Sequence, residues 1–278
     1  MDMNFTYHRK TLCASDVDHP MVCQALSMLD VVEKAMEDVV AEKISIEKYI
    51  DIIMPYDKFM YQSAKMKPQK SNPINTLQNK KYSTWREQKW APIWELVRKE
   101  IAVKWKTNSL VLIQNLPVVE SIYSSGYLKF KDVDGGIGFK LKLNNKEVLF
   151  PIVAVEDKGG HACSTCFDGV SAQSLRLHRC LPNAFHVFIT DNNISVGKDK
   201  VSDIYNDIDL IVSERGTNRN REDYPKLVAK RFEEVKNGMI DRLSKMSIDD
   251  FTKYHVISST KTSIFREDID KSGVVWNK

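Results

Sequence analysis

Cysteine is scarce in this 278-residue chain, and the five cysteines are an odd number. A small disulfide-stabilised fold is therefore not expected, because such folds pair an even set of cysteines within a short secreted chain. The N-terminal segment MDMNFTYHRKTL also lacks the long apolar run of a secretory signal or a membrane span. Together these absences predict a soluble intracellular protein with no membrane partner.

Three signatures of common enzyme classes are missing as well. The chain has no Walker phosphate-binding loop, no Gly-x-Ser-x-Gly nucleophile elbow and no Gly-x-Gly-x-x-Gly dinucleotide fingerprint. Apolar residues nevertheless make up 42 % of the chain, enough to bury a hydrophobic core. The net charge of +4 excludes little by itself, so the positions of the charges are more informative.

Positive charge is concentrated in two stretches. Residues 65–89 carry seven Lys or Arg against one acid, and the segment ERGTNRNRED holds Arg215, Arg219 and Arg221 among Gly, Asn and Thr. This composition is typical of exposed loops. Each stretch could bind phosphates or be an ordinary solvated loop, and the sequence leaves both interpretations open.

The first part of the chain has helical periodicity. Apolar residues recur at helical spacing from His19 to about Phe59, which predicts one or two amphipathic helices closed by Pro55. Residues 65–89 are predicted to form a linker or long loop. A further helix is expected to run from about Pro92 to Lys106.

The middle of the chain changes to strand periodicity. The segments SLVLIQNL, GYLKF, AFHVFIT and DIDLIVS are strand-like, and the continuous apolar run VLFPIVAV is typical of a strand covered on both faces. DGVSAQSLRLHRC predicts a helix capped by Asp168 or Ser171, and a C-terminal amphipathic helix has Pro225 in its first turn. We therefore expect a mixed α/β sheet flanked by helices, within one domain. Its predicted parts are a mainly helical segment 1–110, an α/β core 111–215 and a helical segment 216–278.

The stretch DVDGGIGFKLKLNNKEVLFPIVAVEDKGG places acids near the ends of two neighbouring strands. If residues 144–146 form a three-residue hairpin loop, counting along both strands places Asp134 opposite Glu156, with Cβ atoms about 4.5–5.5 Å apart. A two-residue loop would shift the register by one position and still leave these acids adjacent. Lys158 follows Glu156 by two residues and is therefore expected on the same face.

Two carboxylates and an ammonium group at one sheet end suggest a particular chemistry. Neighbouring carboxylates repel each other unless a cation joins them, and oxygen ligands favour Mg²⁺, which completes its shell with substrate phosphate oxygens. The metal and the lysine could then support hydrolysis of a phosphodiester. An ordinary hairpin with solvated acids has the same spacing, so the residues alone leave both interpretations open.

The quoted stretch resembles the active-site segment of the PD-(D/E)xK nucleases, specifically the EcoRI-like type II restriction endonucleases. The resemblance covers about residues 120–195 and departs at Val133, where the motif usually has proline. Carried over by position, it implies that Asp134 and Glu156 bind Mg²⁺ and that Lys158 is the catalytic lysine. Gly135 and Gly136 match the glycine pair of the motif.

The resemblance implies a restriction-endonuclease-like mixed central sheet flanked by helices, with helical N- and C-terminal additions. It also implies a bacterial cytoplasmic homodimer that cuts double-stranded DNA at a palindromic site. The side chains implied to approach the bases are Gln173, Arg176 and Arg179. Arg215 and Arg219, together with residues 65–89, would hold phosphates.

Two alternatives remain. A repair or recombination nuclease of the same fold would use the same chemistry. A non-catalytic, zinc-stabilised DNA-binding protein would use the cluster His161, Cys163, Cys166, His178 and Cys180. The His-x-Cys spacing of the last two residues is unfavourable for chelation from a helix, because positions two apart point about 200° from each other.

Overall fold

The computed structural model describes residues 5–14, 17–65, 73, 80–143, 146–158, 164–190, 195–196, 199–200, 207–214, 223–257 and 264–268. The chain divides into two compact units. The helical unit comprises Met1–Leu96 and Asn218–Lys236, and the sheet unit comprises Val97–Thr217 and Asn237–Lys278. The sequence predicted one domain whose parts change after residues 110 and 215, and the division between the two units falls at other positions.

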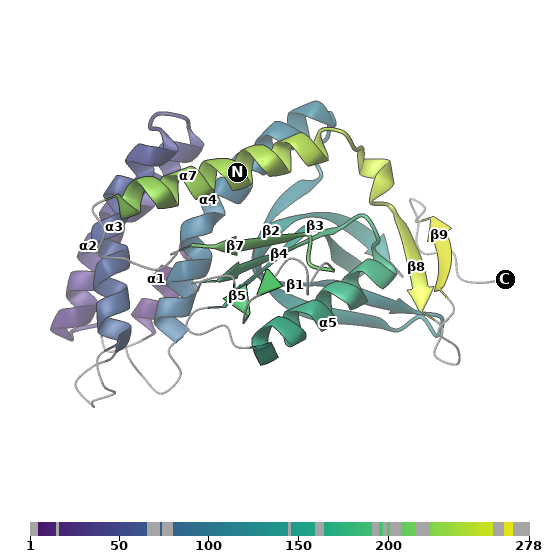
Figure 1. The fold of residues 1–278 in the computed structure, drawn as a ribbon, viewed down its shortest axis with the longest axis horizontal. Coiled ribbons are helices and arrows are strands. Elements are labelled where there is room, and N and C mark those ends of the chain that lie inside the picture. Colours follow the sequence, from purple (N-terminus) through teal and green to yellow (C-terminus); the bar gives the residue numbers. More distant parts are fainter. Residues whose placement is uncertain are drawn as a thin grey trace. The chain divides into compact units, whose positions relative to one another are not determined.

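Helices account for the described elements of the helical unit (Figure 1). They are α1 (Tyr7–Cys13), α2 (Pro20–Val40), α3 (Ile46–Lys65) and the first parts of α4 (Lys80–Lys104) and α7 (Tyr224–Leu243). The helical periodicity from His19 to Phe59 is confirmed as the two helices α2 and α3. Their apolar positions, such as Leu29, Met36 and Ile50, are fully buried.

Two prolines lie inside helices that they were predicted to bound. Pro55 is within α3, and Pro92 is within α4, which begins at Lys80, so residues 80–89 are helical and not part of a linker. An interior proline costs a helix about 3 kcal/mol. Burial of a large apolar side chain contributes about 1.5–3 kcal/mol, and α4 buries several aromatic side chains around its proline. These are Trp85, Trp90 and Trp94.

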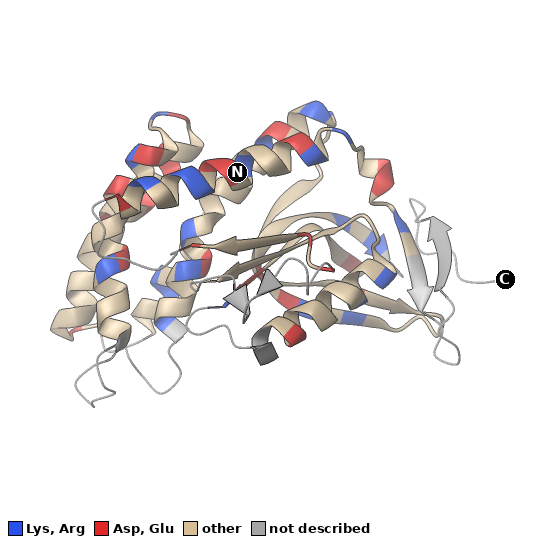
Figure 2. Ribbon diagram, in the orientation of Figure 1, with Lys and Arg blue, Asp and Glu red and all other residues tan. Residues whose placement is uncertain are grey.

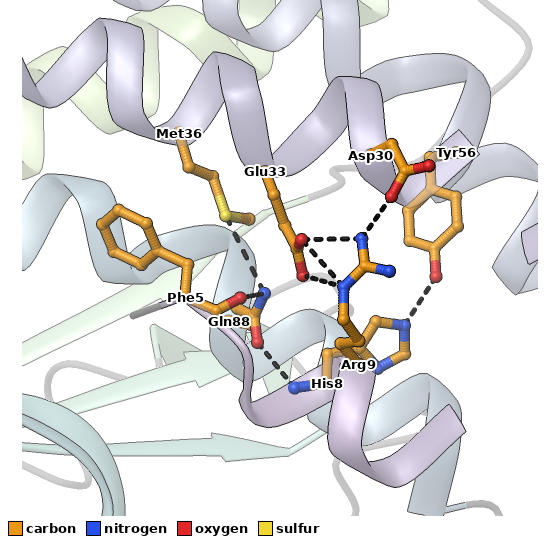
Figure 3. A network of polar contacts seen from close by, with 8 residues as sticks. All are labelled: Phe5, His8, Arg9, Asp30, Glu33, Met36, Tyr56 and Gln88. Atoms are coloured by element: carbon orange, nitrogen blue, oxygen red, sulfur yellow. Dashed lines mark hydrogen bonds and ion pairs between the residues drawn. The ribbon is translucent and has the colours of Figure 1, made fainter. Parts of the chain in front are cut away.

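A polar network is buried in the helical unit around His8 (Figure 3). The imidazole Nε2 lies 2.7 Å from Tyr56 Oη, and Nδ1 lies 2.8 Å from Thr84 Oγ1. The backbone N–H of His8 donates to Gln88 Oε1 at 2.6 Å. Next to it, Arg9 pairs with the acids Asp30 and Glu33 of α2. Short α1 is therefore attached to three longer helices by specific polar contacts.

The sheet unit is built on a seven-stranded mixed sheet in the order β7-β4-β3-β2-β1-β8-β9. Strands β1, β2 and β3 form an antiparallel meander, whereas β4 pairs parallel to β3, β7 parallel to β4 and β8 parallel to β1. The mixed α/β sheet flanked by helices is thus confirmed, but residues 216–278 also contribute strands and are not only helical. The strands are β1 (Leu110–Tyr123), β2 (Leu128–Leu143), β3 (Lys146–Lys158), β4 (Phe185–Thr190), β7 (Leu210–Ser213), β8 (Lys253–Ile257) and β9 (Ile264–Asp268), with a separate pair β5 (Ser195–Val196) and β6 (Asp199–Lys200).

Helix α5 (Ser164–Cys180) packs on the sheet, where it contacts β1, β4 and β8 (Figure 1). Phe167 of α5 lies edge-on against Phe188 of β4, with ring centroids 5.0 Å apart. The predicted caps at Asp168 and Ser171 are wrong, because the helix already begins at Ser164. The apolar contact of Phe167, which precedes both predicted caps, extends the buried face of the helix by a turn.

Basic and acidic residues are both distributed along the helices (Figure 2). On α2, Lys34 pairs with Asp38 at 2.9 Å, and on α7, Lys236 pairs with Glu233 at 2.8 Å. The exposed faces of these two helices are therefore not uniformly basic. Within the described part of the chain, no helix has the length and apolarity needed to cross a membrane.

Candidate active site

The structure brings Asp134, Glu156 and Lys158 together at one end of the β2–β3 pair. Lys158 Nζ lies 3.0 Å from Glu156 Oε2 and 3.6 Å from Asp134 Oδ2. The backbone N–H of Asp157 also donates to Asp134 Oδ2 at 2.7 Å. The Glu156 side chain is only 2 % exposed and that of Asp134 is 17 % exposed, whereas Lys158 is 44 % exposed. One ammonium group, open to solvent, thus joins two largely buried carboxylates.

The register of β2 and β3 explains this convergence. Of the two loop lengths that the sequence left open, the structure has the shorter: Leu143 pairs with Lys146, so the loop has two residues. A bulge next to Ile137 and Gly138 then inserts one extra residue on β3. Beyond the bulge, Gly135 pairs with Val155, which is the register that a three-residue loop would have produced. Pro151 pairs next to this bulge and has no N–H for the ladder, which is a physical reason for the irregularity there.

Gly136 has a packing role two residues beyond Asp134. Its φ is +131°, and a Cβ at this position would lie 1.9 Å from the carbonyl oxygen of Val153. Only glycine tolerates both the positive φ and this contact without a shift of the backbone. At Gly136 the backbone is approached closely by the neighbouring strand β3, and this contact sets the path of β2 next to Asp134.

The two acids have opposite shifts of pKa. Burial, followed by the nearby charge of Glu156, raises the pKa of Asp134. Burial also disfavours the ionised form of Glu156, but Lys158 and Lys131 outweigh it and lower the pKa of that carboxyl. Burial opposes the charge on Lys158, yet Glu156 and Asp134 raise the pKa of its ammonium group. Glu156 is therefore the more firmly ionised acid of the pair.

Lys131 is a member of this cluster that the sequence analysis missed. Its Nζ contacts Glu156 Oε1, so both oxygens of Glu156 have a lysine partner. Lys131 lies on β2, three residues before Asp134, and pairs with Val118 of β1. No motif marks this lysine. A physical argument could have found it: a buried glutamate needs a positively charged partner, and Lys131 on the neighbouring strand is such a residue.

Asp134 and Glu156 supply carboxylate oxygens, the ligand type that a hard divalent cation such as Mg²⁺ prefers. Lys158 Nζ stands between Asp134 Oδ2 and Glu156 Oε2, where a shared positive charge is already stabilised. Mg²⁺ is commonly held by one or two carboxylates together with water and phosphate oxygens, so two acids suffice. Among the described residues, no group of three or more His, Cys, Asp and Glu side chains is arranged to hold a metal.

A small cavity lies beside Glu156, between the sheet and α5. Its volume open to water is about 20 Å³, which is room for roughly one water molecule. Polar and apolar side chains both contribute to its walls. The polar residues are Glu120, Lys131, Glu156, Gln173 and His186. His186 is a core residue: it is 3 % exposed, and burial lowers its pKa to about 4.

The predicted DNA-contacting residues of α5 have different surroundings. Gln173 is half-buried and lines the cavity with its Oε1 buried, so its contact with a DNA base stays a prediction. Arg176 Nε donates to Glu120 Oε1 at 2.9 Å, and Arg179 is exposed. Arg215 and Arg219 lie outside the described residues, and contacts of the four arginines with DNA stay predictions.

The possible zinc ligands are only partly described. His178 Nε2 lies 2.9 Å from Asp209 Oδ2 and 3.0 Å from the carbonyl oxygen of Ala184. Cys180 is buried, which raises the pKa of its thiol to about 12. Both features are unfavourable for a zinc thiolate–imidazole pair, because zinc binds the deprotonated thiol and an available ring nitrogen. His161, Cys163 and the Cys166 side chain lie outside the described part.

No protein-family model matches this sequence, and a comparison with curated proteins found no significant match.

Proposed function

We propose that this protein is a Mg²⁺-dependent, sequence-specific endonuclease of the type II restriction class, acting on double-stranded DNA. The observation that carries the proposal is the convergence of Asp134, Glu156 and Lys158 from paired neighbouring strands. A buried acid pair, with pKa values shifted in opposite directions and an ammonium group between them, is typical of a catalytic site.

The side chains divide the proposed work between them. The carboxylates of Asp134 and Glu156 would hold the ion. When bound, Mg²⁺ supplies Lewis-acid stabilisation of the negative charge that develops on the phosphate. Lys158 is the most exposed member of the three, so its ammonium can turn towards substrate and orient the water that attacks phosphorus. Attack by this water breaks one P–O bond and leaves a phosphate end and a hydroxyl end.

The fold supports the same proposal. A mixed sheet in which an Asp-Gly-Gly strand pairs with an apolar strand ending in Glu-x-Lys, with a helix packed on it, is the arrangement that the resemblance implies. We therefore propose the restriction-endonuclease-like fold for the sheet unit. A homodimer acting on a palindromic site belongs to this proposal, because two-fold protein symmetry can match two-fold DNA symmetry.

The decisive experiment is incubation of the purified protein with phage DNA and Mg²⁺, repeated with the Lys158→Ala variant. We expect defined fragments from the wild type and none from the variant, with Lys140→Ala on the same sheet as the matched control. Lys140 forms an exposed ion pair with Glu147 towards the hairpin end of the β2–β3 pair, away from the end that carries the three residues, so its loss should leave cleavage unchanged. Intact DNA with the wild type at all Mg²⁺ concentrations would refute the proposal.

The cleavage assay, together with metal analysis and DNA-binding measurements, separates the alternatives. Nicking that depends on DNA structure instead of sequence would favour a repair or recombination nuclease. Stoichiometric zinc in the purified protein, together with DNA binding that survives Glu156→Ala, would favour the non-catalytic zinc-stabilised protein.

A further inference from the structure

Lys131 and Lys158 contact different oxygens of the same buried carboxylate. Lys131 Nζ contacts Glu156 Oε1, whereas Lys158 Nζ lies 3.0 Å from Oε2 and also reaches Asp134. The two lysines therefore differ in what they join. Lys158 stands between the acids, and Lys131 contacts Glu156 on its other oxygen.

The surroundings of Glu156 give this second contact a physical purpose. The carboxylate is 2 % exposed, and a buried charge is stable only when it is paired and hydrogen-bonded. The cavity lined by Glu156 and Lys131 has room for about one water molecule, so a carboxylate without its partner could rotate into that space. Such a rotation would turn Oε2 away from Lys158.

We propose that Lys131 is a positioning residue of the candidate active site, which holds the Glu156 carboxylate by Oε1 so that Oε2 stays in contact with Lys158, the ammonium group that also reaches Asp134. This inference rests on the proposed nuclease function. Lys131 acts through Glu156 and not by contact with the substrate. Because β2 carries both Lys131 and Asp134, the same strand supplies one acid and orients the other.

The first test measures cleavage of phage DNA at saturating Mg²⁺ by Lys131→Met and Lys131→Arg. Methionine keeps most of the side-chain volume and removes the charge, so we expect cleavage about 100-fold slower, the effect typical of a misplaced catalytic group. Arginine restores the charge-assisted contact, so its rate should stay within about 10-fold of the wild type. Lys140→Met is the matched control, since it breaks the exposed pair with Glu147 on the same two strands and should cut normally.

The second test does not depend on activity. Melting temperatures are measured for Lys131→Met, Glu156→Gln and the double variant in a double-mutant cycle. If Lys131 holds Glu156, the lysine substitution lowers the melting temperature in the wild-type background and much less in the Glu156→Gln background. The corresponding cycle for Lys140 and Glu147, which are 54 % and 62 % exposed, should show additive effects.

The outcomes distinguish the inference from the function it rests on. Wild-type rates for Lys131→Met, or additive melting shifts for Lys131 and Glu156, overturn the positioning role while the nuclease assignment stands. Equal loss of activity in the Met and Arg variants would mean that charge at this position does not matter, and also overturns it. A wild-type protein that never cleaves DNA overturns both proposals. The activity of the wild type therefore shows whether the nuclease function or only the role of Lys131 has failed.

Discussion

Each unit of this protein contains a buried polar network, and the side chains at the centres of the two networks, His8 and Glu156, differ in charge. In the helical unit, His8 is fully buried, and its ring nitrogens lie within hydrogen-bonding distance of the neutral hydroxyls of Tyr56 and Thr84. In the sheet unit, two carboxylates and two ammonium groups meet around Glu156. The first network has a neutral imidazole at its centre, with a hydroxyl next to each ring nitrogen. The second brings charged groups together, and its two carboxylates repel each other.

This contrast supports the proposal that the Glu156 network serves catalysis, whereas the His8 network serves stability. Burial lowers the pKa of His8 to about 3, so it stays neutral and its hydrogen bonds hold the helices together. Burial and Glu156 raise the pKa of Asp134, so the folded protein disfavours the ionised form that a metal would need. A group kept at an energetic disadvantage is more readily explained by function than by packing.

The sharpest way to break the comparison is Asp134→Asn. The amide keeps an oxygen that can accept the Asp157 N–H but removes the charge, so we expect DNA cleavage to fall by about 10³-fold through loss of metal stabilisation. Because repulsion from Glu156 is removed as well, the free energy of unfolding at pH 7 should be unchanged or rise by about 1 kcal/mol. Cleavage rates and urea denaturation measure the two effects. A large loss of stability would place Asp134 with the structural network instead.

Gly136→Ala tests whether the backbone holds the site. The added Cβ would lie 1.9 Å from the Val153 carbonyl oxygen at a φ of +131°, so we expect more than about 3 kcal/mol of destabilisation, with disruption of the β2–β3 pairing. Gly169→Ala is the control, because nothing lies within 4 Å of its Cβ position in α5. Alanine there should stabilise the protein by up to about 1 kcal/mol. Equal melting temperatures for the two variants would contradict the role given to Gly136.

The pH dependence of stability should carry the mark of His8. Its folded pKa of about 3 lies below its ordinary value of 6.5, so between these values the unfolded chain binds the extra proton. The stabilising effect is present above pH 6.5 and is lost as the pH falls towards 3, by about 2 kcal/mol between pH 7 and pH 5. Urea denaturation of the wild type and of His8→Gln at both pH values measures this, and the variant should lose less.

His178 of the sheet unit provides the opposite sign as a control. Burial lowers the pKa of His178, but the ion pair with Asp209 outweighs this and raises it overall. Its contribution is therefore present below its ordinary pKa and is lost as the pH rises through the folded value. His178→Gln should make the protein lose more stability on acidification, not less. Identical pH profiles for the wild type and both variants would remove the electrostatic basis of the contrast.

Local patterns in the sequence determined most of the secondary structure and the composition of the candidate site. Helical periodicity predicted α2 and α3, strand periodicity predicted β3, β4 and β7, and strand alternation placed Asp134, Glu156 and Lys158 at a common end. These predictions hold because periods of 3.6 and 2 residues express which face of an element is buried. The resemblance supplied the proposed chemistry, which the periodicities do not contain.

Tertiary structure decided what depends on partners distant in the chain. Burial of tryptophans around Pro92 outweighed the local tendency of proline to end α4. A bulge on β3 offset the one-residue change of register that the two-residue hairpin loop introduces. The contact of Lys131 with Glu156, 25 residues apart in sequence, likewise follows from strand pairing and burial. Short segments of sequence determine local propensities. The partner of a buried charge depends on which residues the folded sheet brings next to it.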